Sequence, residues 1–447
     1  MSKIDARSAV HFLRMNTVFA SSKRLDHQMQ GWERLPAERL AQVTAAASAR
    51  QARFAMENTE FYRDYYRDAG FTLKDLDDPA AFLELPIVEK SHVREHRELF
   101  ISKEKTNRNS VESRTGGSTG EPLRILRDVR FPARVLEWQL LRWWGVPVYG
   151  NFLDVRRENT KISTSTRRHD LSWWPSRRFQ HNTFYFDDQA MAELAEKWRR
   201  MSPDYVVGYV GGIYEAARRM EALGLHLPAP TAIATTAAPL TKAIRHEISR
   251  IFGAPVYDQY RCAEIPWMAG ECSRQDGLHV FEPLRRIEIV DRQSHVLSHG
   301  ETGETVVSDL GNRVFPLIRY RIGDLSRTVE GTCPCGVTTP RIASVAGRTS
   351  DELCLPSGAI VPTINLTNLC DDYIDDVSQF QIHQKADSSV ELRLVMKRNS
   401  NVGEDIAQTL RNVLNGEVPV SLKIQDEIAH DGGKIRYMTS DISAPGR

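Results

Sequence analysis

The chain has 447 residues, 41% hydrophobic and 26% charged, which is typical of a globular protein too long for one compact core. Its 59 Lys and Arg residues balance 58 Asp and Glu residues, and a formal net charge of +1 argues against a nucleic-acid or acidic-membrane partner. It contains no run of roughly 20 apolar residues and no apolar signal core at its start, so we expect a cytoplasmic protein. Because its charge is balanced, we expect its partners to be small molecules, and a homodimer is compatible with the sequence.

Helices are predicted for the first part of the chain, about 1–100. Apolar residues recur at intervals of three and four from Asp5 to about Asp68, and LPIVEKSHVREH adds a further helix. The Gly-rich stretch SRTGGSTGEP at 113–122 then precedes the strand-like EPLRILRD. This stretch is therefore expected to be a loop between extended segments.

Phosphate is one natural ligand of this loop, because glycines let backbone amides converge and Ser and Thr add hydroxyl donors. An ordinary surface turn has the same composition. The loop is not of the Walker type, because Glu121 and Pro122 follow Gly120 where Lys and Ser or Thr would open a helix.

Helices and strands alternate in the middle of the chain. The pattern predicts, in order, a helix at 191–201, a strand at 204–210, a helix at 212–223, a strand at 231–236, a helix at 242–252 and a strand at 254–260. Such alternation predicts crossover units and a largely parallel sheet covered by helices.

The chain is expected to divide into two domains. The sequence turns β-like and Gly-rich at about 284–346, which predicts a β-rich subdomain, and the last part contains a strand (VELRLVMK) and a helix (EDIAQTLRNVL) of its own. We therefore predict an α/β fold with a large N-terminal domain at 1–350, of mixed or parallel sheets covered by helices, and a small mobile α+β lid at 351–447.

Polar residues follow strand-like segments at two places. Tyr260 and Glu264 come just after a buried-looking strand, at the edge where open α/β sheets bind ligands. Asp324 ends FPLIRYRIGD, where a carboxylate can accept hydrogen bonds from two hydroxyl groups. The alternatives are a core tyrosine, a solvated glutamate and a turn aspartate.

Two further segments belong to the same series. AGRTSDEL supplies Arg348 and Asp351 at the domain boundary, and DGGKIRYM places Lys434 on a Gly-rich turn. In this order the segments resemble the adenylate-forming ligase superfamily, most closely its phenylacetate–CoA ligase-like branch, which includes capsule-polysaccharide members. The resemblance covers nearly the whole chain and extends to weaker phrases, namely NTEFYRDYY, LPIVEKSHVREH, AAPLT and GETGETVVSDL.

The resemblance implies a role for each motif. The loop would bind the β- and γ-phosphates of ATP through Thr115, Gly116, Gly117, Ser118, Thr119 and Gly120. Tyr260 would stack on adenine, Asp324 would bind the ribose hydroxyls, and Glu264 would hold Mg²⁺. The remaining roles would be backbone contacts beside adenine and the acyl group (Ala237, Ala238), contact with ribose and phosphate (Arg348), the hinge (Asp351) and the catalytic lysine of the lid (Lys434).

Two positions depart from the superfamily's pattern. Many members carry Lys where this chain has Glu121, and Gly where it has Arg261. The first change puts direct side-chain help to the phosphates in doubt, and the second puts the local turn in doubt.

The resemblance implies an ATP- and Mg²⁺-dependent ligase that activates a carboxylic acid, aryl or arylacetic, to an acyl-adenylate and transfers it to a thiol, coenzyme A. One alternative keeps adenylation and changes the acceptor to an amine, a hydroxyl or a carrier protein in a biosynthetic or polysaccharide pathway. Another is an ATP-binding scaffold without turnover, against which the presence of Lys434, Glu264 and Asp324 argues. Four aromatic residues are candidates either for an acyl pocket or for the core, namely Trp143, Trp144, Tyr149 and Tyr209.

Cysteine and histidine residues occur in two short turns. Cys272 lies seven residues before His279, and Cys333 and Cys335 form a Cys-Pro-Cys turn. Three thiolates and one imidazole complete a tetrahedral zinc shell with no place left for water, although two unrelated turns with buried thiols are the alternative. Some phenylacetate–CoA ligase-like enzymes have a similar Cys/His zinc site, so the resemblance favours a structural Zn²⁺. The other cysteines, Cys262, Cys354 and Cys370, are expected to be packed thiols.

Overall fold

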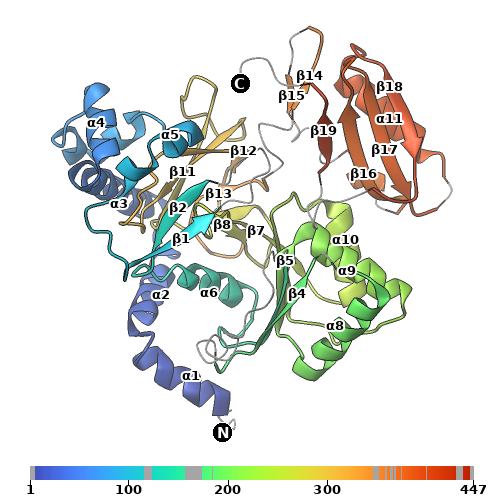
Figure 1. Ribbon diagram of the computed structural model, residues 1–447, viewed down its shortest axis with the longest axis horizontal. Coiled ribbons are helices and arrows are strands. Elements are labelled where there is room, and N and C mark those ends of the chain that lie inside the picture. Colours follow the sequence, from blue (N-terminus) through green and yellow to red (C-terminus); the bar gives the residue numbers. More distant parts are fainter. Residues whose placement is uncertain are drawn as a thin grey trace. The chain divides into compact units, whose positions relative to one another are not determined.

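The computed structural model describes residues 6–114, 123–156, 174–183, 185–345, 352–357, 360–362, 366, 369–373, 375–398, 400–428 and 436–442 (Figure 1). The chain folds into two compact units, each made of two segments. Unit 1 comprises Met1–Trp144 and Gln259–Ala343, and unit 2 comprises Gly145–Asp258 and Ser344–Arg447.

Unit 1 begins with helices, as the three- and four-residue periodicity predicts. Its helical elements are α1 (Ala6–Asn16), α2 (Ala20–Trp32), α3 (Ala37–Asn58), α4 (Glu60–Asp68), α5 (Lys90–Glu95), α6 (Arg134–Trp143) and three 3₁₀ turns, η1 (Asp75–Asp77), η2 (Pro79–Glu84) and η3 (Arg97–Phe100). The Thr59 side chain caps α4 by accepting a hydrogen bond from the Tyr62 amide. Phe61 stacks on Phe100 with ring centroids 3.9 Å apart, which joins α4 to η3.

The strands of unit 1 form two antiparallel arrangements. A hairpin joins β1 (Ser110–Arg114) and β2 (Arg124–Asp128) and flanks the Gly-rich loop. A larger sheet has the order β10-β11-β12-β13-β9-β8, and β8 pairs with Gln259 and Tyr260 at the end of β7. These strands are β8 (Ala269–Glu271), β9 (Leu278–Val280), β10 (Arg285–Val290), β11 (Thr302–Asp309), β12 (Tyr320–Val329) and β13 (Arg341–Ile342).

Unit 2 contains a parallel sheet of order β7-β6-β5-β3-β4, which confirms the predicted crossover units. Its strands are β3 (Phe152–Arg156), β4 (Arg178–Asn182), β5 (Tyr205–Tyr209), β6 (Ala232–Thr236) and β7 (Val256–Tyr260), and its helices are α8 (Asp188–Met201), α9 (Val210–Ala222) and α10 (Lys242–Phe252). Thr241 caps α10, and Gly253 ends it in the left-handed conformation. Gly208 leaves no room for a side chain, because a Cβ there would lie 2.1 Å from the Val155 carbonyl oxygen on β3.

The C-terminal part of unit 2 is a small sheet of order β18-β17-β16-β19 with α11 against it (Figure 1). Its elements are β16 (Val377–Gln384), β17 (Val390–Met396), α11 (Val402–Val413), β18 (Val420–Ile424) and β19 (Met438–Ser440), preceded by β14 (Glu352–Cys354), β15 (Ile360–Pro362) and η5 (Asp371–Tyr373). Ile406 and Leu410 of α11 belong to the same buried cluster as Leu392 and Leu394 of β17. The predicted strand and helix of this part are thus confirmed.

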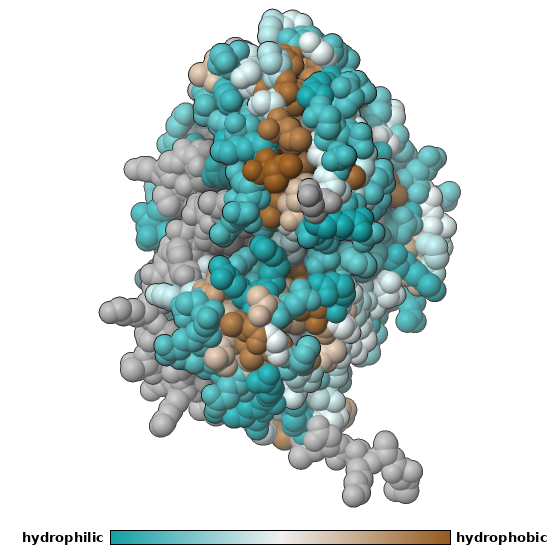
Figure 2. Space-filling model, turned by 90° about the vertical axis from the view of Figure 1, so that its right-hand side faces the viewer, coloured by the Kyte–Doolittle hydropathy of each residue, from teal (hydrophilic) through white to brown (hydrophobic). Residues whose placement is uncertain are grey.

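The visible surface is mixed in polarity. Figure 2 shows apolar side chains in patches surrounded by hydrophilic ones. Across the described residues, no helix has both the length and the apolar character required to cross a bilayer.

Candidate nucleotide and metal sites

Several predicted site residues lie outside the described residues. These are the loop residues Thr115–Gly120, together with Arg348, Asp351 and Lys434. Their roles therefore stay predictions. The strands on both sides of the loop and the residues Tyr260, Glu264 and Asp324 are described, and all of them belong to unit 1.

The structure brings Tyr260 and Asp324 together. The Tyr260 hydroxyl donates a hydrogen bond of 2.7 Å to Oδ2 of Asp324, although the two residues are 64 positions apart. Tyr260 is only 7% exposed, and burial, reinforced by the Asp324 carboxylate, raises the pKa of its phenol well above the usual value. The phenol therefore stays protonated and orients the carboxylate. The burial of Tyr260 confirms the core interpretation, and its contact with adenine stays a prediction.

Glu264 lies in the turn that follows β7. It is 6% exposed, and Nζ of Lys90, the first residue of α5, lies 3.7 Å from its Oε1. An isolated buried carboxylate would be costly, and the contact with Lys90 offsets part of that cost. The solvated-charge alternative for Glu264 is therefore wrong.

The turn that carries Glu264 is attached to the β1–β2 hairpin. The carbonyl oxygen of Ala263 accepts hydrogen bonds from Ser113 Oγ of β1 at 3.1 Å and from Arg127 Nη2 of β2 at 2.6 Å. Both strands that flank the Gly-rich loop therefore contact the residue before Glu264. Lys90, Arg127 and the contact of Ser113 with Ala263 were not predicted, because no local sequence pattern relates residues that lie more than 130 positions apart.

Ala237 and Ala238 lie in unit 2, directly after β6. Ala237 has a φ of 72°, a left-handed conformation that is uncommon for alanine. Such conformations are often found at functional sites, where the surrounding structure maintains them. The geometry is thus compatible with the predicted backbone contacts.

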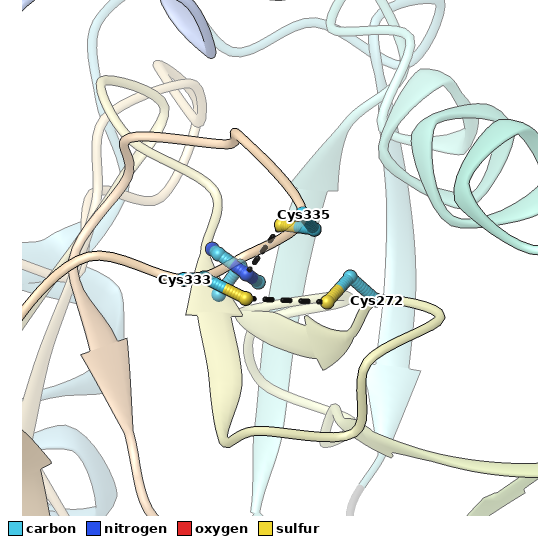
Figure 3. Close-up of side chains that lie close together, drawn as sticks. Cys272, Cys333 and Cys335 are labelled. Atoms are coloured by element: carbon cyan, nitrogen blue, oxygen red, sulfur yellow. Dashed lines mark hydrogen bonds between the residues drawn. The ribbon is translucent and has the colours of Figure 1, made fainter.

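The four predicted metal ligands converge in unit 1. Cys272 and His279 come from the β8–β9 region and Cys333 and Cys335 from the turn after β12, and their ligand atoms all lie within 4.8 Å of one another. Figure 3 shows the three cysteine side chains directed toward a common point. The alternative of two unrelated turns is therefore wrong.

Two distances in this cluster match those of a tetrahedral metal site. The Sγ atoms of Cys272 and Cys333 are 3.7 Å apart, and Cys335 Sγ is 3.4 Å from His279 Nε2. With Zn–S bonds of about 2.3 Å and Zn–N bonds of about 2.0–2.1 Å, a tetrahedron places two sulfurs about 3.8 Å apart and sulfur and nitrogen about 3.5 Å apart. All six cysteines are free, and 3.7 Å is too long for a disulfide.

The surroundings suit metal ligation. Burial lowers the pKa of His279 to about 4, which leaves the imidazole neutral, and its Nδ1 lies 3.2 Å from Thr339 Oγ1. Such a hydrogen bond orients a ligating histidine. The backbone amides of Arg274 and Val337 each lie 3.4 Å from a cysteine sulfur, so they can donate to a thiolate. Thr339 was not predicted.

Two of the four candidate acyl-pocket aromatics pack beside this cluster. Trp143 lies over His279 with ring centroids 5.3 Å apart, and Trp144 Nε1 donates a 2.8 Å hydrogen bond to the Glu271 carbonyl. The core interpretation therefore holds for Trp144, which is buried, whereas Trp143 is half-buried. Tyr149 and Tyr209 are half-buried in unit 2.

Unit 2 contains a cavity of about 750 Å³ with a mostly polar lining. Its wall includes Lys397 and Glu247, whose Nζ and Oε1 are 2.7 Å apart. Its charges are thus largely paired with one another, and it contains none of the predicted nucleotide residues.

No protein-family model matches the chain. Three solved structures have a similar fold. A 2-hydroxyisobutyryl-CoA ligase in the postadenylation state with R3-HIB-AMP has a TM-score of 0.75 at 18% identity, over 92% of this chain and 91% of the other. An anthranilate CoA ligase with anthranoyl-AMP has a TM-score of 0.53 at 12% identity, over 75% and 67%. The amide bond synthetase McbA of Marinactinospora thermotolerans has a TM-score of 0.53 at 13% identity, over 81% and 81%. The fold is that of the adenylate-forming ligases.

Sequence relatives point to the same class. Protein CapK of Staphylococcus aureus is 24% identical over 405 residues, which cover 87% of this chain and 86% of CapK. The phenylacetate–coenzyme A ligase of Thermus thermophilus is 33% identical over 131 residues, and that of Escherichia coli is 34% identical over the same length; each match covers 28% of this chain and 29% of the relative. The homologues of this chain are therefore CapK and the phenylacetate–coenzyme A ligases, and its fold matches that of adenylate-forming CoA ligases.

Proposed function

We propose that this chain is an ATP-dependent ligase that converts a carboxylic acid, aryl or arylacetic, into an acyl-adenylate and then transfers the acyl group to coenzyme A. The observation that carries the proposal is the hydrogen bond between Tyr260 and Asp324. Tyr260 lies four residues before the buried Glu264 in the chain. An aromatic ring for adenine, an oriented carboxylate for ribose hydroxyls and an anionic metal ligand are the groups that an ATP site requires.

In the first step, an oxygen of the substrate carboxylate bonds to the α-phosphorus of ATP. The bond from that phosphorus to the bridging oxygen breaks, and pyrophosphate leaves with the bonding electrons. Mg²⁺ bound at Glu264 would offset negative charge on the phosphate oxygens. Lys434 would add a positive charge at the α-phosphate, and the Gly-rich loop would contact the β- and γ-phosphates.

In the second step, the acyl group would pass from AMP to coenzyme A. The coenzyme A thiol would lose its proton to solvent and its sulfur would attack the acyl carbon. The bond from that carbon to the phosphate oxygen would break, which forms the thioester and releases AMP. We assign Arg348 to contact with ribose and phosphate and Asp351 to the hinge of the lid at 351–447, both from the resemblance stated above. Ala237 and Ala238 would offer backbone groups beside adenine and the acyl group, and the left-handed Ala237 supports this assignment.

We also assign a structural Zn²⁺ to Cys272, His279, Cys333 and Cys335. The sulfur–sulfur and sulfur–nitrogen distances support it. Burial raises the pKa of Cys272 and raises that of Cys335 to about 12, so a bound cation is needed to convert these thiols to thiolates. Four protein ligands leave no position for a catalytic water.

The proposal is tested by incubating the protein with ATP, Mg²⁺ and a panel of aryl, arylacetic, amino and fatty acids. We expect one class of acid to release pyrophosphate with AMP as the nucleotide product. Glu264→Gln should abolish this release, whereas Glu330→Gln, at an exposed position of the same unit, should not. ADP and orthophosphate as products would contradict adenylation.

A second candidate function changes only the acceptor. Similarity to the amide bond synthetase McbA over 81% of this chain favours an amine as the alternative nucleophile. Supplying acyl-adenylate with either coenzyme A or an amine, and identifying the product by mass, separates the two.

A further inference from the structure

Arg127 lies on β2, at the base of the hairpin that flanks the Gly-rich loop. The β1–β2 register pairs Val111 with Arg127 and Ser113 with Ile125, so Ser113 and Arg127 lie on the same face of the hairpin. Both side chains donate to the Ala263 carbonyl, and Arg127 Nη2 makes the shorter bond, 2.6 Å. The guanidinium is thereby held next to the turn that contains Glu264.

Arg127 differs from other arginines of unit 1 in that its guanidinium has no ion-pair partner among the described residues. The buried guanidinium groups of Arg285, Arg319 and Arg341 each pair with a carboxylate, Asp309, Glu288 and Asp276 respectively. Arg127 is half-buried, and within the described parts of the chain it makes no ion pair, although the Asp309 and Glu264 carboxylates act to raise its pKa; its buried Nε has no hydrogen-bond partner.

This arrangement is unfavourable without a ligand. Burial lowers the pKa of Arg127, and the like charge of Arg261 lowers it further. A partly buried cation without a direct ion pair costs free energy, and an unpaired buried N–H adds to that cost. A bound anion would remove both penalties, because a guanidinium donates through Nε and Nη together to the oxygens of one phosphate.

We propose that Arg127 binds the pyrophosphate portion of ATP and of the product, a role that rests on the proposed adenylating function. The location supports this portion of the nucleotide, since β2 flanks the loop assigned to the β- and γ-phosphates and Ala263 precedes the assigned Mg²⁺ ligand. The loop itself carries Glu121 where many relatives of the superfamily carry lysine, so the positive charge comes from another element. Arg127 supplies it from the adjoining strand.

The test measures binding of inorganic pyrophosphate in Mg²⁺ buffer by titration calorimetry on the full chain. Arg127→Gln retains an N–H donor for Ala263 and loses the charge, and it should weaken pyrophosphate binding by roughly 10–100-fold. Arg127→Lys retains the charge without the planar fork and should lie between wild type and Arg127→Gln. The matched control is Arg124→Gln, on the same strand, whose Nη2 pairs with Glu112 at 2.6 Å on the exposed side; it should bind like wild type.

Three outcomes would overturn the assignment. The first is wild-type affinity in Arg127→Gln. The second is equal weakening in the Gln and Lys variants together with equally lowered melting temperatures, because the arginine would then serve only the Ala263 contact. If only the Lys variant folds, unchanged affinity in that variant also overturns it, since lysine cannot reproduce the bidentate contact. A wild-type protein that neither binds pyrophosphate nor releases it from ATP contradicts the proposed function instead.

Discussion

Substitution of Cys272 by Ser should remove the metal from unit 1 and lower its stability. Cys272 and Cys333 are 61 residues apart in the chain, and their sulfurs are 3.7 Å apart in the fold. A metal bound by both therefore cross-links the β8–β9 region to the turn after β12. Serine is almost isosteric with cysteine but does not provide a thiolate, so the change isolates the metal bond from packing.

The loop length gives the expected size of the effect. A cross-link that closes a loop of this length restricts the unfolded chain by about 4 kcal/mol in the chain-entropy model. For a domain of 150–250 residues, 1 kcal/mol shifts the melting temperature by about 2–4 °C, so we expect a fall of about 8–16 °C.

The assay combines metal analysis of the purified protein with calorimetric melting. Wild type should contain about one zinc per chain by the four-ligand stoichiometry, and Cys272→Ser should contain little and melt earlier. Cys354→Ser, on β14 of unit 2, is the matched control and should keep both the zinc and the melting temperature. Metal-free wild-type protein, or a Cys272→Ser protein that melts with the control, would refute the reasoning.

Three further predictions concern other parts of the chain. Lys434→Ala should slow pyrophosphate formation by roughly 10²–10³ while acyl transfer from supplied acyl-adenylate continues, with Lys423→Ala as the control; a parallel loss of both rates would contradict the assignment. Burial raises the pKa of Glu282 from 4.5 to about 7, so the folded protein holds a proton that the unfolded chain releases. The free energy of unfolding of the wild type should therefore fall relative to that of Glu282→Gln as the pH rises from 4.5 to about 7. If urea unfolding gives the same difference between the two proteins at pH 5 and at pH 8, this prediction is wrong. Arg285→Met leaves Asp309 buried without its partner and should cost about 3–5 kcal/mol in urea unfolding, part of which Asp309→Leu should restore; a single variant as stable as wild type would rule this out.

Local sequence patterns determined the elements of this protein. The helix predicted at 242–252 is α10, Lys242–Phe252, because its apolar periodicity, the Thr241 cap and Gly253 all lie within a few residues of it. The parallel strands β5, β6 and β7 were predictable because each is a short buried run next to a helix, whereas β3 and β4 of the same sheet were not predicted. The motifs also identified Tyr260, Glu264 and Asp324, since residue type and spacing along the chain are what a motif records.

The tertiary structure alone decided which of these residues meet. The bond between Tyr260 and Asp324 spans 64 positions, and the contact of Arg127 with Ala263 spans 136. The two halves of the cysteine cluster were visible in the sequence, but only the pairing of β9 with β13 and of β12 with β13 brings them to one point. The physical reason is that periodicity and capping act within a few residues, whereas an unpaired buried donor, such as Nε of Arg127, becomes apparent only when the chain has folded and its neighbours are in place.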